Sequence, residues 1–235
     1  MIAYKAFYPG LKSFNGMQFE TGKTYRVENK GIAKGGFHAA ADPMFCLGFV
    51  QPRSGGIYHE VDISGITDRG ELENGACGHY SAMTGERLRI GRRLSVEDML
   101  SACMTYRLAQ CVRTEDGKGS GYGIKVVNES RFGTAYVRGT LCTAVAAEED
   151  SEAFASGERC TAIAEGDCSS AMIEDACSRN CLAVAKGRHS RIGGTYGTWL
   201  LFLNEDKPLY ACVGTDGIRP DTYYTLTNGK IEKAS

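Results

Sequence analysis

Residues 133–194 read GTAYVRGTL, CTAVAAEED, SEAFASGER, CTAIAEGD, CSSAMIEDA, CSRN, CLAVAKGRH and SRIGG when they are divided at recurring small residues. The units begin at Gly133, Cys142, Ser151, Cys160, Cys168, Cys181 and Ser190. Four of the intervals are nine residues long, one is eight, and a thirteen-residue step absorbs the four-residue insertion at 177–180. A recurrence at nearly fixed spacing is typical of a repeat architecture. This stretch therefore decides the fold.

Each unit of the repeat predicts a short β-strand followed by a turn. Its first five residues alternate between small and larger side chains, as the two faces of a strand do. A strand of about five residues and a Gly-containing turn of about four make half a coil of a solenoid, so two units make one coil of about eighteen residues. The small residues imply a thin interior, in which four thiols are expected to pack like Ala side chains. These thiols belong to Cys142, Cys160, Cys168 and Cys181.

The fourth residue of most units is a larger apolar side chain that this alternation directs outward. These residues are Tyr136, Val145, Phe154, Ile163 and Val184. An apolar row of this length is too extensive for open solvent, so we expect other copies of the chain to cover it in a homo-oligomer, specifically a trimer. The alternative is a monomeric solenoid that its own flanking domain covers. The repeat resembles the β-roll heads of trimeric bacterial adhesins, although their period differs.

The flanking sequence indicates a mostly β protein with one helix. Ser95 and Asp98 form a capping pair at the start of an apolar pattern of helical period. We expect a β-rich module at 1–94, the helix at 95–113, a Gly-rich connection at 114–132, the repeat at 133–194 and returning strands at 195–235. The expected fold is a small β-rich domain built from both termini. The parallel β-roll, a solenoid of nine-residue half-coils, is inserted into it.

Composition and charge exclude several classes of function. The chain of 235 residues is 43% hydrophobic and 23% charged, as globular proteins are. Its formal net charge of -1 gives no support for a nucleic-acid partner. No stretch reaches the roughly 18 apolar residues of a membrane-spanning helix, and the first residues lack a secretory signal pattern. We therefore expect a cytoplasmic protein without membrane contact, whose ten cysteines are mostly reduced.

The two ends of the chain carry several recognisable sequence motifs. They read YKAF (4–7), QFETGKTY (18–25), KGGFHAAADP (34–43) and YHEVDISG (58–65), followed near the C-terminus by GTYGTWLLFL and RPDTYYTLTNGKIE. These resemble an uncharacterised family of phages and prophages, whose members run YKGF, FQYEVGKTY and SGFHxCxxP. Those members carry an Ala/Ser/Gly-rich middle and close with GSW and PDTWYTLKNGK. The resemblance implies a phage protein in the cytoplasm of an infected bacterium.

The N-terminal module is also faintly similar to ADP-ribosyltransferase cores. In that fold an aromatic residue and a G-[FY]-x-x-[AT]-D turn hold NAD, and a carboxylate on a later strand orients the ribose. The resemblance implies Tyr4, Phe37, His38, Asp42 and Glu60 as candidates here. Such chemistry needs an aromatic ring to stack on nicotinamide and a carboxylate to stabilise an oxocarbenium-like transition state. The opposing interpretation is a turn whose aromatic ring belongs to the core.

No other constellation predicts chemistry. Cys177, Cys181 and His189 are metal-ligating residue types, but Cys181 occupies a repeat position, so no metal site is expected. The expected function is a non-enzymatic, phage-encoded oligomeric accessory or interaction protein without a cofactor. It would bind a host or phage protein and in that way inhibit a bacterial defence system. Two alternatives stay open, namely an NAD-dependent ADP-ribosyltransferase-like enzyme and a protein that sequesters a small nucleotide.

Overall fold

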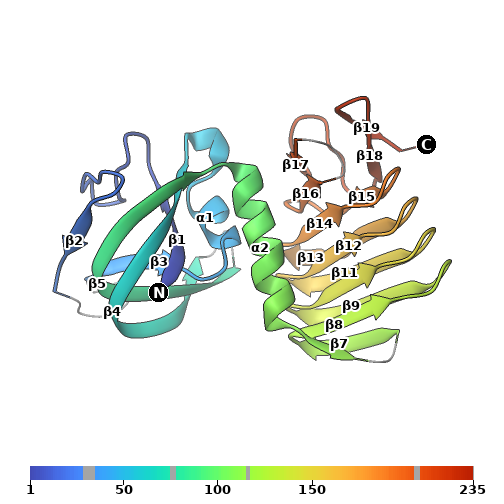
Figure 1. Cartoon of the computed structure of the whole chain (residues 1–235), viewed down its shortest axis with the longest axis horizontal. Helices are drawn as coiled ribbons and strands as arrows, with labels where there is room; N and C mark the ends of the chain where they lie inside the picture. Colours follow the sequence, from blue (N-terminus) through green and yellow to red (C-terminus); the bar gives the residue numbers. More distant parts are fainter. Residues whose placement is uncertain (29–34, 75–77, 115–116, 204–206, 235) are drawn as a thin grey trace. The chain divides into compact units, whose positions relative to one another are not determined.

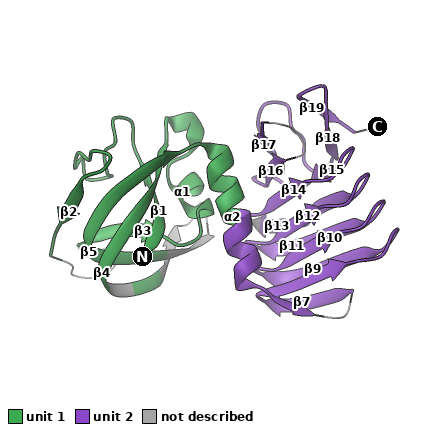
Figure 2. Ribbon diagram, viewed as in Figure 1, with its two compact units in different colours: residues 1–103 green, residues 104–235 purple. Residues whose placement is uncertain are grey.

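The computed structural model describes residues 1–28, 35–74, 78–114, 117–203 and 207–234, with the backbone alone at 67–68, 71–74, 78–81 and 179. Strands make up 52% of it. The chain divides into two compact units, Met1–Cys103 and Met104–Ser235 (Figure 2). Each unit has a cluster of buried apolar residues of its own, as independent domains do.

The first unit is a small antiparallel barrel. Its strands are β1 (Ile2–Phe7), β2 (Thr24–Arg26), β3 (Phe37–Ala40), β4 (Ile57–Asn74) and β5 (Gly78–Leu94). They pair in the order β2-β5-β3-β1-β4, and a further pairing of β4 with β5 closes the ring (Figure 1). The pairings are antiparallel throughout. The ring encloses the core of this unit.

Large side chains fill the interior of the barrel. The alternation of β1 places Ala3, Lys5 and Phe7 on the same face. The ring of Phe7 lies 5.3 Å from that of Phe19 and 5.7 Å from that of His59, measured between centroids. The buried members of the core are Ala3, Phe7, Phe19, Phe37, Ala39, Val61, Ile63, Met83, Leu88 and Ile90. A few aromatic rings thus supply much of the buried apolar surface.

Two α-helices accompany the strands, where the sequence predicts one, and the additional helix follows a turn at Asp42-Pro43. Helix α1 (Met44–Phe49) forms at that turn, and a 3-10 helix follows at Pro52–Ser54. Helix α2 (Val96–Gln110) begins with the expected capping box, because the Ser95 hydroxyl accepts from the Asp98 N–H at 3.1 Å and the Asp98 carboxylate accepts from the Ser95 N–H at 2.9 Å. Neither α-helix of the described chain is long and apolar enough to cross a membrane.

The second unit is a β-solenoid of about 5 turns between residues 118 and 202. Its first sheet contains β6 (Val112–Thr114), β8 (Ile124–Asn128), β10 (Thr143–Ala146), β12 (Thr161–Ala164), β14 (Leu182–Ala185), β16 (Trp199–Phe202) and β17 (Leu209–Cys212). Its second sheet contains β7 (Lys118–Tyr122), β9 (Thr134–Thr140), β11 (Glu152–Glu158), β13 (Ser170–Arg179), β15 (Arg191–Gly193), β18 (Tyr224–Thr227) and β19 (Lys230–Lys233). Strands of successive coils are parallel, with Ala144, Ala162 and Ala183 in register. The predicted solenoid of nine-residue half-coils is confirmed.

The solenoid extends beyond the predicted repeat at both ends. The sequence predicts a Gly-rich connection at 114–132. The structure instead has the first coils of the solenoid there, formed by β7 and β8 together with β6 just before them. Strand β16 continues the first sheet parallel to β14, and β17 and β18 add antiparallel strands to β16 and β15. The C-terminal strands therefore do not return to the N-terminal sheet. Trp199–Phe202 pairs with the preceding coil because its Leu200 and Phe202 supply the inward apolar positions.

The structure also corrects the register of the fifth unit. Ala171, rather than Ser170, lies in register with Ala153, and Met172 lies in register with Phe154. The position equivalent to Ser151 therefore belongs to Ser169, and Cys168 is exposed instead of lying inside the coil. The half-coils keep their nine-residue spacing up to this point, and the extra residues form a bulge in β13 between the paired positions at 174 and 179.

A stack of glycines fixes one corner of the coil. Gly139 and Gly157 have φ angles of 142° and 114°. A Cβ atom on Gly139 would lie 1.9 Å from the carbonyl oxygen of Gly121, and one on Gly157 would lie 2.0 Å from that of Gly139. Only glycine fits a backbone that passes this close to its neighbour. This close approach is the physical reason for glycine at Gly139 and Gly157, which lie one coil apart in paired strands.

Candidate functional site

The five residues predicted for the oligomer interface divide between the two sheets. Val145, Ile163 and Val184 lie on β10, β12 and β14 of the first sheet, and their exposed fractions are 4%, 1% and 0%. The prediction that they face another chain is wrong, because the chain itself already removes them from solvent. Tyr136 and Phe154 lie on β9 and β11 of the second sheet and are only partly buried.

A buried arginine lies at a corner of the first sheet. Arg107, on α2, has an exposed fraction of 0%. Its guanidinium donates to the carbonyl oxygens of Cys160 at 3.3 Å and Asn180 at 2.8 Å. Both acceptors lie where the chain turns from the second sheet into the first, and Asn180 has a left-handed φ of 53°. Arg107 therefore has a structural role, which the helical pattern at 95–113 gave no reason to expect of a basic residue.

The outward side of the second sheet carries a row of large apolar side chains. Tyr136, Phe154 and Met172 follow one another in register on β9, β11 and β13, and we refer to them as the outer row. The same alternation places Arg138 and Glu174 on the outward side, two residues further along β9 and β13. Tyr136 and Phe154 keep part of their surface accessible. Tyr136 and Phe154 are thus the accessible part of the predicted apolar surface, and the buried Met172 extends the row although it is not one of the predicted residues.

The C-terminal part of the second sheet is partly covered. The Arg191 guanidinium lies 4.9 Å from the centroid of the Tyr223 ring. Burial raises the pKa of the Tyr223 phenol. Gly193 leaves room for the end of the Met172 side chain, because a Cβ atom there would lie 2.8 Å from the Met172 methyl carbon. The open part of the outer row is thus the side of Tyr136 and Phe154.

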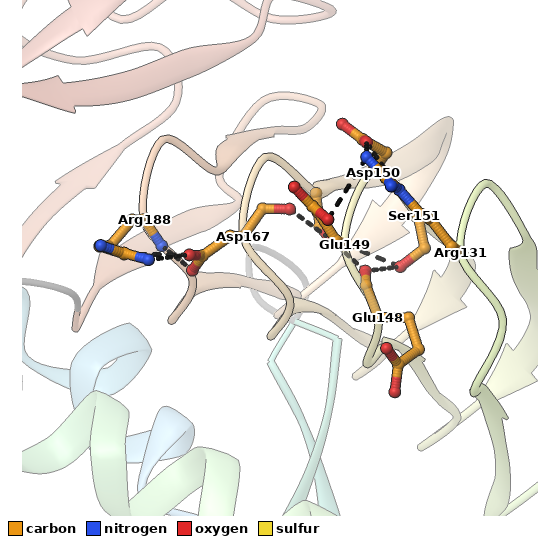
Figure 3. A network of polar contacts seen from close by, with 8 residues as sticks. Arg131, Glu148, Glu149, Asp150, Ser151, Asp167 and Arg188 are labelled. Carbon is orange, nitrogen blue, oxygen red and sulfur yellow. Dashed lines mark hydrogen bonds and ion pairs between the residues drawn. The ribbon is translucent and has the colours of Figure 1, made fainter.

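The turns along one edge of the solenoid carry paired charges (Figure 3). Arg131 binds Asp150 at 2.9 Å, with a second contact to Glu149 at 3.3 Å. Arg188 binds Asp167 at 2.7 Å. Each pair links consecutive coils, and the acidic groups are thereby neutralised by arginines instead of being free to hold a cation. Exposed pairs of this kind contribute little to stability.

Two of the candidate residues for NAD chemistry lie side by side. Tyr4 of β1 pairs with Glu60 of β4. Burial, followed by the Glu60 charge, raises the pKa of the Tyr4 phenol. Glu60 also lies 3.9 Å from the guanidinium of Arg92. Here the structure brings together an aromatic side chain and a carboxylate, as the transferase comparison requires.

The remaining candidates do not complete an open site. Phe37 has an exposed fraction of 5% and packs in the barrel core against Phe19, at 6.1 Å between ring centroids. Asp42 has an exposed fraction of 0% and accepts hydrogen bonds from the Met44 N–H at 3.1 Å and the Cys103 thiol at 3.4 Å. These contacts leave Phe37 no free face for a nicotinamide ring. Two surface hollows of this unit contain none of the five candidates.

A buried amine and thiol near β1 were not among the candidates. The Lys5 ammonium donates to the His38 carbonyl oxygen at 2.7 Å, and burial lowers its pKa to about 8. Burial raises the pKa of the Cys46 thiol to about 12. Burial, and then the Lys5 charge, lowers the pKa of His38. The signal for Lys5 was its position between Ala3 and Phe7 in an alternating strand. A thiol with a raised pKa is a poor nucleophile.

The thiols inside the solenoid have the packing role expected of them. The Sγ atoms of Cys142, Cys160 and Cys181 lie 3.2, 3.3 and 3.1 Å from the carbonyl oxygens of glycines in the preceding coil. Burial raises the pKa of Cys181 to about 11. Among the described residues, no group of His, Cys, Asp or Glu has the arrangement of a metal site. Cys177, Cys181 and His189 do not form such a group.

The first unit can be compared with a known family. Residues 1–102 match a domain of unknown function, DUF7666. The match ends within one residue of the boundary that the structure gives the first unit, at Cys103. The DUF7666-like unit is therefore the barrel together with the start of α2, and the solenoid lies outside the match. Neither the curated proteins nor the solved structures contained a match to the chain.

Proposed function

We propose that this protein is a non-enzymatic interaction protein that binds a protein partner through the outer row of its solenoid. The observation that carries the proposal is the alignment of Tyr136, Phe154 and Met172 on three successive strands. Aromatic residues, Met and Arg are enriched in protein–protein interfaces, and the same sheet adds Arg138 on its outward side. Hydrogen-bonded strands hold the row rigidly, so a partner loses little of its binding energy in ordering the surface.

The geometry of the barrel supports a binding role over catalysis. Phe37 and Asp42 are buried in the core, and the neighbouring Cys46 thiol has a pKa raised to about 12. The Tyr4–Glu60 pair is thus not joined by Phe37 and Asp42 in the open site that NAD chemistry requires. The barrel therefore supports the binding role better than the transferase alternative.

The proposal includes a biological setting. The motifs at 4–7, 18–25 and 34–43 resemble those of an uncharacterised phage family. A phage-encoded binding protein acts on a protein of the infected bacterium, and inhibition of a defence system is the role we assign to it. The host protein bound by the outer row is then the target of that inhibition.

Charge placed on the outer row tests the proposal. Phe154→Asp and Tyr136→Asp put a carboxylate at the centre of the interface, and burying such a side chain contributes about 1.5–3 kcal/mol. We expect at least a tenfold loss of partner retained from infected-cell extract, measured by quantitative mass spectrometry. Tyr196→Asp is the matched control, because Tyr196 is 71% exposed and lies outside the row. Equal retention by wild type, row variants and control would overturn the proposal.

A further inference from the structure

The solenoid has an open end formed by its first coil. The two sheets end at β6 and β7, and no strand among the described residues lies beyond them (Figure 1). Four of the five residues of β7 are exposed, whereas β10, β12 and β14 are buried throughout. Repeat proteins need their terminal coils covered, and an exposed edge strand is a template for pairing with another chain. This end is therefore an incomplete structure by itself.

The backbone of β7 presents its unpaired groups to that open side. The Gly117 carbonyl oxygen accepts from the Tyr136 N–H at 3.1 Å, and the Gly123 N–H donates to Thr140 at 3.1 Å, so both glycines bond to β9. In a strand, the N–H and C=O groups of alternate residues point to opposite sides. Lys118, Ser120 and Tyr122 therefore direct their donors and acceptors away from β9, toward the open side.

Apolar side chains collect on the first coils. Val112 of β6, Tyr122 of β7 and Phe132, in the turn between β8 and β9, have exposed fractions of 71%, 68% and 72%. Val112 pairs with Ile124, which packs against the interior core, so Val112 belongs to the face that later coils bury. Its exposure arises because no further coil covers it. Large exposed apolar groups beside an unpaired edge are typical of an interaction surface.

The opposite end of the solenoid differs in its charges. Its outermost strand in the second sheet, β19, begins with Lys230 and ends with Lys233. Antiparallel pairing of two β19 strands about their centre would place these lysines opposite each other, which is unfavourable. The same operation on β7 places Lys118 opposite Tyr122 and Ser120 opposite itself, with no like charges in contact. Self-pairing is thus disfavoured at the C-terminal end and compatible with the N-terminal end.

We propose that two copies of this chain pair end to end through β7, antiparallel and centred on Ser120. A two-fold axis normal to the sheet reverses the strand direction and the stacking direction together, so the second sheet continues from one copy into the other. Lys118 then exchanges hydrogen bonds with Tyr122 of the other copy, and Ser120 with its own equivalent. The same axis brings the two β6 strands together. This self-association goes beyond the partner binding assigned to the outer row.

The mass of the purified full chain gives the first test. Sedimentation velocity should show a species of twice the 25.4 kDa chain mass. A trimer, which the sequence predicts, or a filament would overturn the two-fold pairing, and so would a monomer at all concentrations. A foreign strand bound to β7 would give a monomer with added mass and would equally overturn it.

Substitutions at Ser120 locate the interface. Ser120→Pro removes the outward N–H from both copies, and we expect the dimer dissociation constant to rise about a hundredfold. Lys233→Pro makes the same change on the edge strand of the other end and should leave the dimer intact. A dimer that tolerates Ser120→Pro as well as this control would contradict the proposal.

A charge swap distinguishes self-pairing at Ser120 from any other use of this edge. Ser120→Lys and Ser120→Asp each place like charges on the two-fold axis, and each variant alone should weaken the dimer about fivefold. Both changes are at an exposed side chain, so folding is not at risk. An equimolar mixture should recover a heterodimer at wild-type affinity. Weak association of the mixture would overturn the proposed register.

Discussion

The barrel and the solenoid both have a buried core, but the barrel fills it with large aromatic side chains and the solenoid mainly with small ones. In the barrel, Phe7, Phe19 and Phe37 meet ring to ring around one centre. In the solenoid, Ala, Cys and Ser repeat at equivalent positions, and the coils stack so closely that Gly139 and Gly157 leave no room for a Cβ atom. The barrel depends on a few large groups, whereas the solenoid depends on small residues where neighbouring coils approach most closely. Truncating a large side chain should therefore destabilise the barrel, and adding an atom at a close contact between coils should destabilise the solenoid.

The largest effect is expected from Phe7→Ala in the barrel. Phe7 has an exposed fraction of 0% and contacts Phe19 and His59. Deleting its ring leaves a cavity and should lower the free energy of unfolding by about 4 kcal/mol. Urea denaturation of the full chain, with hydrogen exchange to locate the change, measures the loss. The control is Phe14→Ala, because Phe14 is 82% exposed and its loss should cost less than about 0.5 kcal/mol. Similar losses in both variants would contradict this account of the barrel.

A smaller loss is expected when one methyl group is added to the solenoid. The Cβ atom of Gly139→Ala would overlap the Gly121 carbonyl oxygen at a φ of 142°, which should cost about 3 kcal/mol. In Gly197→Ala, the new atom meets nothing within 4 Å at a φ of 81°, so only backbone strain of about 1 kcal/mol is expected. Hydrogen exchange in β9 and β11 would report the difference. If both variants lose the same free energy of unfolding, close stacking of the coils is not the reason for glycine at Gly139.

The smallest effect is a pH dependence confined to the barrel. Burial lowers the pKa of His59, whose Nδ1 atom lies 2.9 Å from the Gly91 carbonyl oxygen, and burial also lowers the pKa of His38. Below pH 6.5 the unfolded chain then binds more protons than the folded barrel, so stability falls as the pH decreases. Urea midpoints of barrel amides between pH 7.5 and 5.5 test this trend. His59→Gln should flatten it, and an unchanged slope in that variant would exclude His59 as a cause.

The two units also differ in how far the sequence predicts them. The solenoid is encoded locally, because every coil repeats the small inward residues that the coil before it requires. The error at Cys168 arose because a cysteine was taken as the start of the unit, whereas the nine-residue spacing continues from Cys160 to Ser169 and the bulge comes later in β13. The closed barrel was less predictable, since the pairing of β4 with β5 and that of β1 with β4 depend on contacts distant in sequence.

The candidate sites show the same limit at the level of single residues. The alternation of small and large residues correctly places Phe154 on the outward side of its strand. It predicts Ile163 to be equally accessible to another chain. Only the packing of the whole chain reveals that Ile163 is buried and Phe154 is partly accessible. Phe37 likewise has the right residue type for NAD binding, and the barrel core takes its ring instead.

Ring closure and open stacking have different consequences for the evolution of the two units. The coils of the solenoid are equivalent, and strands paired in register, such as β9 and β11, are eighteen residues apart. Duplication of one such segment adds a complete coil that the existing neighbours can pair with, so this unit can change length in whole steps. The barrel has no comparable freedom, because β4 and β5 already complete its circumference. Inherited length variation should therefore accumulate in the solenoid, and with it the area available for recognising new proteins.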